Sequence, residues 1–245
     1  MAVHELSHLF ENGMPQYFAV PPFLHVFQRR LGDVVRPGGV TIASDLLVAP
    51  IHAGTHVDAP AHVAVPPVEA TPPGAETIPP LVARGVLLDC RDAGVQELGV
   101  AEVERALERA GTAVRPGDVV LVATGWEARW SHGDYASMEA FAQTPGLGVE
   151  AARLLVDAGA IAIGADNATL EPASTQLGVH RLLLHERGVY IIENLRLSTL
   201  LEEGAHLFAF LALPLRIAGG TGSPIRAVAV TGDGWEAVVR PFARS

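Results

Sequence analysis

The stretch PIHAGTHVDAPAH, residues 50–62, places His52, His56, Asp58 and His62 within eleven positions of a largely apolar segment. Imidazole nitrogens and carboxylate oxygens are ligands for first-row divalent metals, and histidine also moves protons near neutral pH. A single histidine here would be interpreted as a hydrogen-bonded structural group. Four such side chains together, in a chain with only 10 histidines, favour a metal site instead.

The backbone of this stretch is expected to be extended rather than helical. Glycine, β-branched residues and proline are poor choices in a helix interior, and the stretch contains Gly54, Thr55, Val57 and Pro60. In an extended chain alternate residues share a side, so His56 and Asp58 would point the same way.

A straight strand would nevertheless separate His52 from His56 by about 13 Å, at about 3.3 Å per residue. Ligands of one zinc ion lie about 2.1 Å from it, so the chain must bend between the two histidines. Gly54 can provide the bend, because it has no Cβ and adopts positive φ easily. His62 follows Pro60 and is predicted to turn away from the ion, where it could move protons.

Further metal ligands must come from distant parts of the chain. The candidates are His180 and His185 in VHRLLLHERG, and Glu193 in VYIIENL. An acidic residue at the end of an apolar strand is costly unless it is paired or bound to a metal. The same argument applies to Asp166, for which a capping or hydrogen-bonded role is an equal alternative. His185 is expected to face solvent, because charged residues follow it.

Composition excludes several classes of partner. The chain of 245 residues has 49% hydrophobic and 18% charged residues, with 17 Lys plus Arg against 27 Asp plus Glu. Nucleic acid and anionic membrane are poor partners, since both are held largely by clustered basic residues. The N-terminus lacks a secretory pattern, and the most apolar run is too short to span a bilayer. Cys90 is the single cysteine and is predicted to be a core residue in a cytoplasmic protein.

An α/β fold follows from the alternation of two patterns. Continuous apolar runs predict strands covered on both faces, at 85–90, 118–126, 160–166, 188–195, 207–215 and 224–233. Segments with helical period, 100–111 and 148–160, lie between some of these runs and end at glycine. No repeat or change of composition divides the chain, so residues 1–245 are predicted to form one domain.

Two segments are expected to lie outside this pattern. Residues 63–80 contain three Pro-Pro pairs and are predicted to form a long loop, either a linker or part of a substrate entrance. The first 50 residues are aromatic and rich in turn signals, and residues 1–35 are predicted to be an extended arm or hairpin.

Trp126 follows an apolar run and could be either core or a pocket wall. No Gly-x-Ser-x-Gly elbow supports serine hydrolysis.

The whole pattern resembles the cyclase-type family of metal-dependent hydrolases, which includes bacterial kynurenine formamidase and isatin hydrolase. Its hallmark, His-x-Gly-Thr-His-x-Asp-x-Pro-x-His, is matched without a gap by HAGTHVDAPAH. The resemblance continues in LSHLFENGMP, VLVATGW, IGADNATLEP, HRLLL, VYIIENL and FLALPLRIAGGTGSPIRAVAV. It implies a swivelling β/β/α domain with a mixed sheet, assembled as a homodimer or homotetramer with N-terminal segments reaching a neighbouring subunit.

Carried over to this sequence, the resemblance implies that His52, His56 and Asp58 bind one metal ion, with Asp58 able to bridge to a second. His180 and Glu193 would complete the site, and His62 would be the catalytic acid and base. One or two Zn²⁺ ions are expected, with Mn²⁺ as an alternative.

The N-terminal segment departs from the family pattern. Kynurenine formamidases carry a Trp and then Pro-Gly-Asp there, whereas this chain has Tyr17 and Phe18, which become the candidate substrate-binding residues with Trp126. The usual Asp-Thr-Pro-Ser is here Asp-Asn-Ala-Thr at 166–169. Isatin hydrolase has Gln at the position of Glu193, so the metal site is closer to the formamidase pattern.

The expected activity is hydrolysis of a C–N bond in an aryl formamide or a cyclic amide or imide, by a metal-activated water with His62 as acid and base. One alternative is a cyclase, lyase or lactone hydrolase acting on a small oxygenated or polyketide-like substrate. Another is a protein that holds a metal without turnover. The substrate is a small molecule in each enzymatic case.

Overall fold

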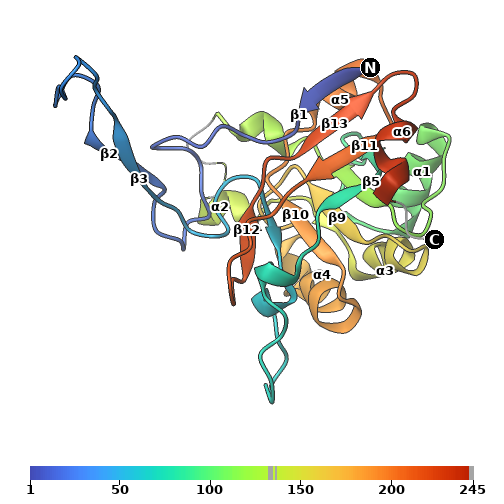
Figure 1. Ribbon diagram of the computed structural model, residues 1–245. Coiled ribbons are helices and arrows are strands. Elements are labelled where there is room, and N and C mark those ends of the chain that lie inside the picture. Colours follow the sequence, from blue (N-terminus) through green and yellow to red (C-terminus); the bar gives the residue numbers. More distant parts are fainter. Residues whose placement is uncertain (132–134, 136, 243–245) are drawn as a thin grey trace.

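The computed structural model describes residues 1–131, 135 and 137–242 (Figure 1). Among these residues, nine strands form one curled mixed sheet. Its spatial order is β1 (Ala2–Glu5), β13 (Val228–Thr231), β11 (Leu207–Ala212), β5 (Leu81–Asp89), β7 (Val119–Ala123), β9 (Ala162–Ala165), β10 (Tyr190–Glu193), β4 (His56–Asp58) and β12 (Gly222–Pro224). All six predicted strand runs overlap observed strands of this sheet.

The centre of the sheet is parallel, and helices connect its strands. Strands β5, β7, β9 and β10 run parallel, while β4, β11, β12 and β13 pair antiparallel to their neighbours. The helices are α1 (Val100–Ala110), α2 (Met138–Phe141), α3 (Val149–Asp157), α4 (Gly178–His180), a π-helical segment (Arg181–Arg187), α5 (Ser198–Glu203) and α6 (Glu236–Val239). The mixed α/β class predicted from the sequence is confirmed.

Two apolar cores lie on opposite faces of the sheet. Along β7, Val120 and Val122 pack with α1, α3 and the π-helical segment, whereas Val119 and Leu121 pack on the other face with α5. This alternation follows from the two-residue period of a strand. All five residues of β7 are buried, as the continuous apolar run predicts. Cys90 is buried as predicted and is a free thiol.

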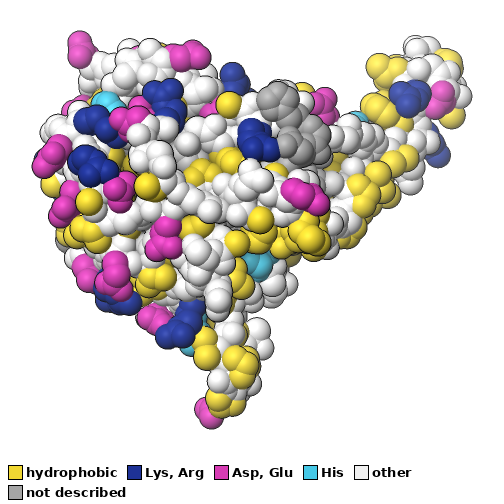
Figure 2. Space-filling view, turned by 180° about the vertical axis from the view of Figure 1, so that it is seen from behind, with side chains coloured by type: hydrophobic (Ala, Val, Ile, Leu, Met, Phe, Trp, Pro, Cys, Tyr) yellow, Lys and Arg dark blue, Asp and Glu magenta, His cyan; other side chains and the backbone are white. Residues whose placement is uncertain are grey.

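Two segments project from this body (Figures 1 and 2). One is the hairpin of β2 (Leu24–Arg29) and β3 (Ser44–Val48), and the other is the proline-rich loop 63–80, which contains one short 3₁₀ turn at Ala75–Thr77. The residues predicted to form one arm, 1–35, therefore belong to two separate parts of the structure. Its first residues form β1 in the main sheet, and its later residues begin the hairpin.

Short elements complete the description. They are the paired strands β6 (Glu97–Leu98) and β8 (Gly146–Leu147) and 3₁₀ turns at Pro60–His62, Trp126–Arg129, Ala173–Thr175 and Arg240–Phe242. Within the described part of the chain, every helix is too short or too polar to cross a bilayer.

Candidate metal centre

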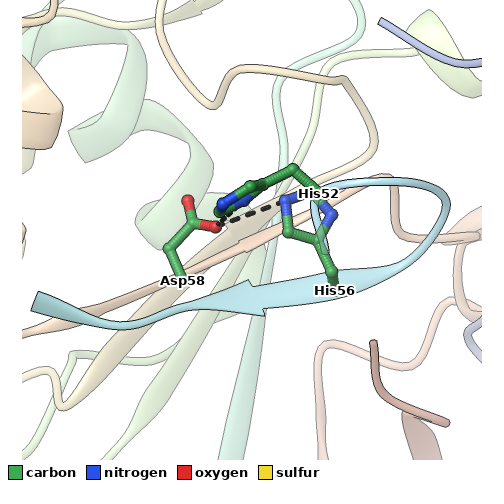
Figure 3. A group of neighbouring side chains, drawn as sticks. All are labelled: His52, His56 and Asp58. Carbon is green, nitrogen blue, oxygen red and sulfur yellow. Dashed lines mark hydrogen bonds and ion pairs between the residues drawn. The ribbon is translucent and has the colours of Figure 1, made fainter. Parts of the chain in front are cut away.

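The bend and the short strand predicted for residues 50–62 are both present. Gly54 has φ +59° and turns the chain so that His52 comes back beside β4. In β4, Val57 packs into the apolar core while His56 and Asp58 occupy the opposite side of the strand (Figure 3). The alternation of the strand thus separates the polar side chains of the site from the core beneath it.

Sheet register brings a second carboxylate to this strand. Strand β10 pairs antiparallel with β4, and Glu193, its last residue, lies directly opposite His56. Glu193 Oε2 is 3.4 Å from His56 Nε2. Glu193 is only 5% exposed, so its carboxyl group is held inside the protein beside the ligand-type groups of β4.

His180 reaches the same place from the helical layer. It is the last residue of α4, and its Nε2 lies 3.4 Å from Glu193 Oε1 and 3.9 Å from Asp58 Oδ2. Asp58 Oδ1, on the other side of the carboxylate, lies 2.7 Å from His52 Nδ1 and 3.3 Å from His56 Nε2. The five ligands expected from the sequence therefore converge, from segments more than a hundred residues apart.

Three of these separations suit a bound cation, whereas His52 Nδ1 and Asp58 Oδ1, at 2.7 Å, form a hydrogen bond. Two ligand atoms at about 2.1 Å from a tetrahedral ion are about 3.4 Å apart. The three His–carboxylate separations between 3.3 and 3.4 Å match that value, and they are longer than good hydrogen bonds. Three of the buried atoms, His56 Nε2, Asp58 Oδ2 and Glu193 Oε1, have no hydrogen-bond partner among the described residues. Buried polar atoms of this kind are normally satisfied, so the residues present fit a metal ion.

The charges of the site also fit a bound metal ion. Burial alone would lower the pKa of His56, but Asp58 and Glu193 raise it to about 10. Burial would likewise lower the pKa of His180, but Glu171 and Glu193 raise it to about 10. Burial would raise the pKa of Asp58, yet the neighbouring imidazoles lower it well below its usual value. Without a cation, protons on the histidines balance the buried carboxylates, and a divalent ion could replace those protons.

Each candidate histidine ligand has a hydrogen-bond partner on its other nitrogen. His52 Nε2 lies 2.9 Å from the Thr221 hydroxyl, His56 Nδ1 lies 2.8 Å from the Gly54 carbonyl oxygen, and His180 Nδ1 lies 2.5 Å from Glu171 Oε1. Such partners orient the ring and fix which nitrogen is left for a metal. The sequence reasoning missed Glu171 and Thr221, which come from a loop and from the segment before β12.

His62 occupies the solvent side of the site. Its ring centroid lies 4.0 Å from that of His52 and 6.0 Å from that of His180, and the residue is exposed. Desolvation lowers the pKa of His62, and the neighbouring histidines act in the same direction. Two sets of groups are close enough to hold an ion, one with His52, His56 and Asp58 and one with Asp58, His62 and His180. The geometry therefore permits His62 to act as a ligand or as a proton carrier.

A buried network of hydrogen bonds links the Gly54 bend and the start of β4 to the end of β10. Asn194 Nδ2 donates to the Gly54 carbonyl, the Thr55 hydroxyl donates to the Asn194 carbonyl, and the Tyr135 hydroxyl donates to Asn194 Oδ1. Asn194 has φ +55°, and its side chain reaches the Gly54 bend through the hydrogen bond to the carbonyl oxygen, at 2.9 Å. Asn194 and Tyr135 were not singled out from the sequence, because nothing in their local pattern distinguishes them from ordinary loop residues.

The remaining candidates contact residues other than the five candidate ligands. Tyr17 and Phe18 form an aromatic group with Phe141 of α2, with ring centroids 4.4 to 6.1 Å apart. Trp126 is 8% exposed and its indole N–H donates to the Tyr135 carbonyl, which agrees with the core alternative.

Two further polar residues considered in the sequence are also accounted for. Asp166 accepts hydrogen bonds from the backbone N–H groups of Thr124 and Gly125 and from the Thr124 hydroxyl, which is the structural role considered for it. His185 is exposed as predicted.

Comparison with known proteins agrees with this architecture. The family model described as "Putative cyclase" matches residues 4–172. Over 184 residues the chain is 32% identical to the kynurenine formamidase of Salinibacter ruber, covering 72% of this chain and 74% of that protein. It is 28% identical over 205 residues to the isatin hydrolase of Roseibium aggregatum, covering 78% and 76% respectively.

A crystal structure described as a novel cyclase superposes with a TM-score of 0.81, at 24% identity, covering 94% of this chain and 87% of that one. The expected fold and family resemblance are thereby confirmed. With its mixed sheet, its converging histidines and carboxylates and this match over most of its length, the chain belongs to the putative cyclase family.

Proposed function

We propose that this protein is a metal-dependent hydrolase that cleaves a C–N amide bond in an aryl formamide or a cyclic amide or imide. The observation that carries the proposal is the convergence of three imidazoles and two carboxylates, in which His56 Nε2, Asp58 Oδ2 and Glu193 Oε1 have no hydrogen-bond partner among the residues that the structure describes. The relatives named kynurenine formamidase and isatin hydrolase support hydrolysis as the reaction class.

The proposed ligands are His52, His56, Asp58, His180 and Glu193. Their nitrogen and oxygen donors suit Zn²⁺, with Mn²⁺ as the alternative. Asp58 belongs to both groups of side chains that could hold an ion, so the proposal allows one ion or two. When bound, such an ion lowers the pKa of a water molecule and polarises a carbonyl oxygen.

His62 is the proposed acid and base. Its lowered pKa leaves the imidazole neutral at pH 7, so one ring nitrogen can accept a proton from the attacking water. The same nitrogen can then give that proton to the leaving nitrogen of the amide. Its exposed position, on the edge of the buried ligand cluster, is where a substrate would approach.

Tyr17 and Phe18 are the proposed contacts for an aromatic part of the substrate. Both rings lie on the segment that leads into the β2–β3 hairpin, and Phe18 is 44% exposed. Trp126 lies deeper, packed with Tyr135, and is proposed only as a wall behind that aromatic group.

The proposed assembly is a homodimer or homotetramer formed through the hairpin. Apolar side chains on both strands face solvent in the single chain, namely Leu24, Val26, Phe27, Leu46, Leu47 and Val48. Figure 2 shows hydrophobic side chains along the length of the projection. An exposed apolar surface of this kind is typical of a protein–protein contact.

A second candidate is a cyclase, lyase or lactone hydrolase acting on a small oxygenated or polyketide-like substrate, and the family description, putative cyclase, supports the cyclase among these. Elemental analysis of the purified protein is the first test, followed by assays on a panel of formamides, cyclic imides and lactones. Activity should disappear after chelation and return with Zn²⁺ or Mn²⁺. Full amidase activity in a metal-free protein would refute the proposal, and turnover of lactones alone would favour the second candidate.

A further inference from the structure

Glu171, a buried carboxylate outside the ligand cluster, contacts His180 through two atoms of that residue. Glu171 Oε1 accepts a hydrogen bond from the His180 backbone N–H, at 2.8 Å, and lies 2.5 Å from its ring Nδ1. Glu171 is 2% exposed and His180 is 4% exposed. Because an ionised carboxylate only accepts hydrogen bonds, the proton of this contact sits on Nδ1.

The other carboxylate oxygen holds the loop that carries His180. Glu171 Oε2 accepts from the backbone N–H of Val179, at 2.9 Å, and from the Thr175 hydroxyl. All four partners of Glu171 are therefore donors. A neutral Gln would place an amide N–H₂ against at least one of them, so the site is built for a carboxylate.

Because one proton is fixed on Nδ1, Nε2 is the nitrogen of His180 that can give up its proton and offer a lone pair to a metal ion. That nitrogen points toward Glu193 Oε1, at 3.4 Å, and Asp58 Oδ2, at 3.9 Å. Among the described partners of the candidate ligand rings, the carboxylate of Glu171 is the charged one; the others are the Thr221 hydroxyl and the Gly54 carbonyl. A carboxylate behind an imidazole raises the basicity of its free nitrogen as well as orienting the ring.

We propose that Glu171 is a positioning residue, which fixes the tautomer and direction of His180 so that Nε2 is presented to the metal site. The inference rests on the proposed metal site and adds a residue to it. It predicts that Glu171 governs metal affinity through His180, rather than only supporting the fold of the loop.

The test compares E171Q with two control variants of the same loop. T175V removes the hydroxyl contact to Oε2 and leaves the contact of Oε1 with His180, and S174A removes only the contact of Ser174 with Glu97. Zinc affinity is measured by competition with a chelating dye. E171Q should bind zinc about 10- to 100-fold more weakly than wild type, with both controls within about twofold. E171D keeps the charge but has a shorter side chain, so its zinc affinity should lie between those of E171Q and wild type. E171D replaces E171Q in the comparison if E171Q does not fold.

Two further measurements separate positioning from a structural role. In an H180A background, E171Q should change zinc affinity by less than about twofold, since coupled residues are non-additive. In metal-free protein with ¹⁵N-labelled histidine, both ring nitrogens of His180 carry protons at neutral pH, and NMR should find its Nδ1–H protected from exchange with water in wild type. The same proton should exchange faster in E171Q, because a hydrogen bond to a neutral amide is weaker than one to a carboxylate.

Equal zinc affinities for E171Q and T175V, or an unchanged exchange rate of the His180 Nδ1–H, would overturn the inference. Absence of zinc binding in wild type would instead refute the proposed function. In that case the exchange measurement alone would decide whether Glu171 orients His180.

Discussion

Replacing Gly54 by Ala tests whether the bend at the metal site depends on glycine. The residue has φ +59°, and a non-glycine residue in this left-handed region costs about 1–2 kcal/mol. An added Cβ would also lie 2.7 Å from Phe10 Cζ and 2.8 Å from Phe10 Cε2. Overpacking of this kind costs about 1–3 kcal/mol, so the expected total loss of unfolding free energy is about 2–5 kcal/mol.

A matched control isolates the two contributions. Gly111, which ends α1, has φ +60° with no atom within 4 Å of an added Cβ. Urea unfolding of the metal-free proteins should therefore show a loss of about 1–2 kcal/mol for G111A and a larger loss for G54A. In an F10A background the additional loss of G54A should shrink, because the ring that blocks the Cβ is gone. A G54A variant no less stable than G111A would refute the steric part of this reasoning.

Three other perturbations have defined outcomes. H62A should reduce kcat by about 10²-fold or more with bound metal unchanged, measured by steady-state kinetics and elemental analysis; loss of metal would instead make His62 a ligand. The pKa of about 10 for His56 and His180 means that their stabilising protons are fully bound below pH 6.5 and are lost as pH rises toward 10. The metal-free protein should therefore be less stable to urea at pH 9 than at pH 7, and a flat profile would contradict the assignment. A V26E/L47E double variant should shift the protein to a smaller species in light scattering without loss of secondary structure, and an unchanged mass would exclude the hairpin as the contact.

Much of the metal centre could be predicted from short-range sequence. Ligand types at 52, 56 and 58, a glycine at the only place where a bend was required, and a carboxylate at the end of an apolar strand each have a local physical reason. The continuous apolar runs likewise located the strands of the main sheet, because strands buried on both faces leave little room for polar residues.

The missed residues depend on tertiary contacts that no local pattern encodes. Glu171 precedes a proline in a loop and resembles an exposed acidic residue until the fold brings α4 onto it. Thr221 meets His52 across 169 positions. The N-terminal strand β1 was predicted as part of an arm, because four residues paired at a sheet edge show too little periodicity to be recognised.

The pairing of Glu193 with His56 across β10 and β4 has a consequence for how this protein could diversify. A one-residue slip between these strands would turn one side chain of the pair to the far face, so the ligand set tolerates no insertion within the ladder. The hairpin and loop 63–80 are attached outside that ladder and can change in length without disturbing it. Exchanging these two projections between relatives should therefore leave the candidate metal ligands in place, so the sheet can serve as a fixed scaffold for engineering.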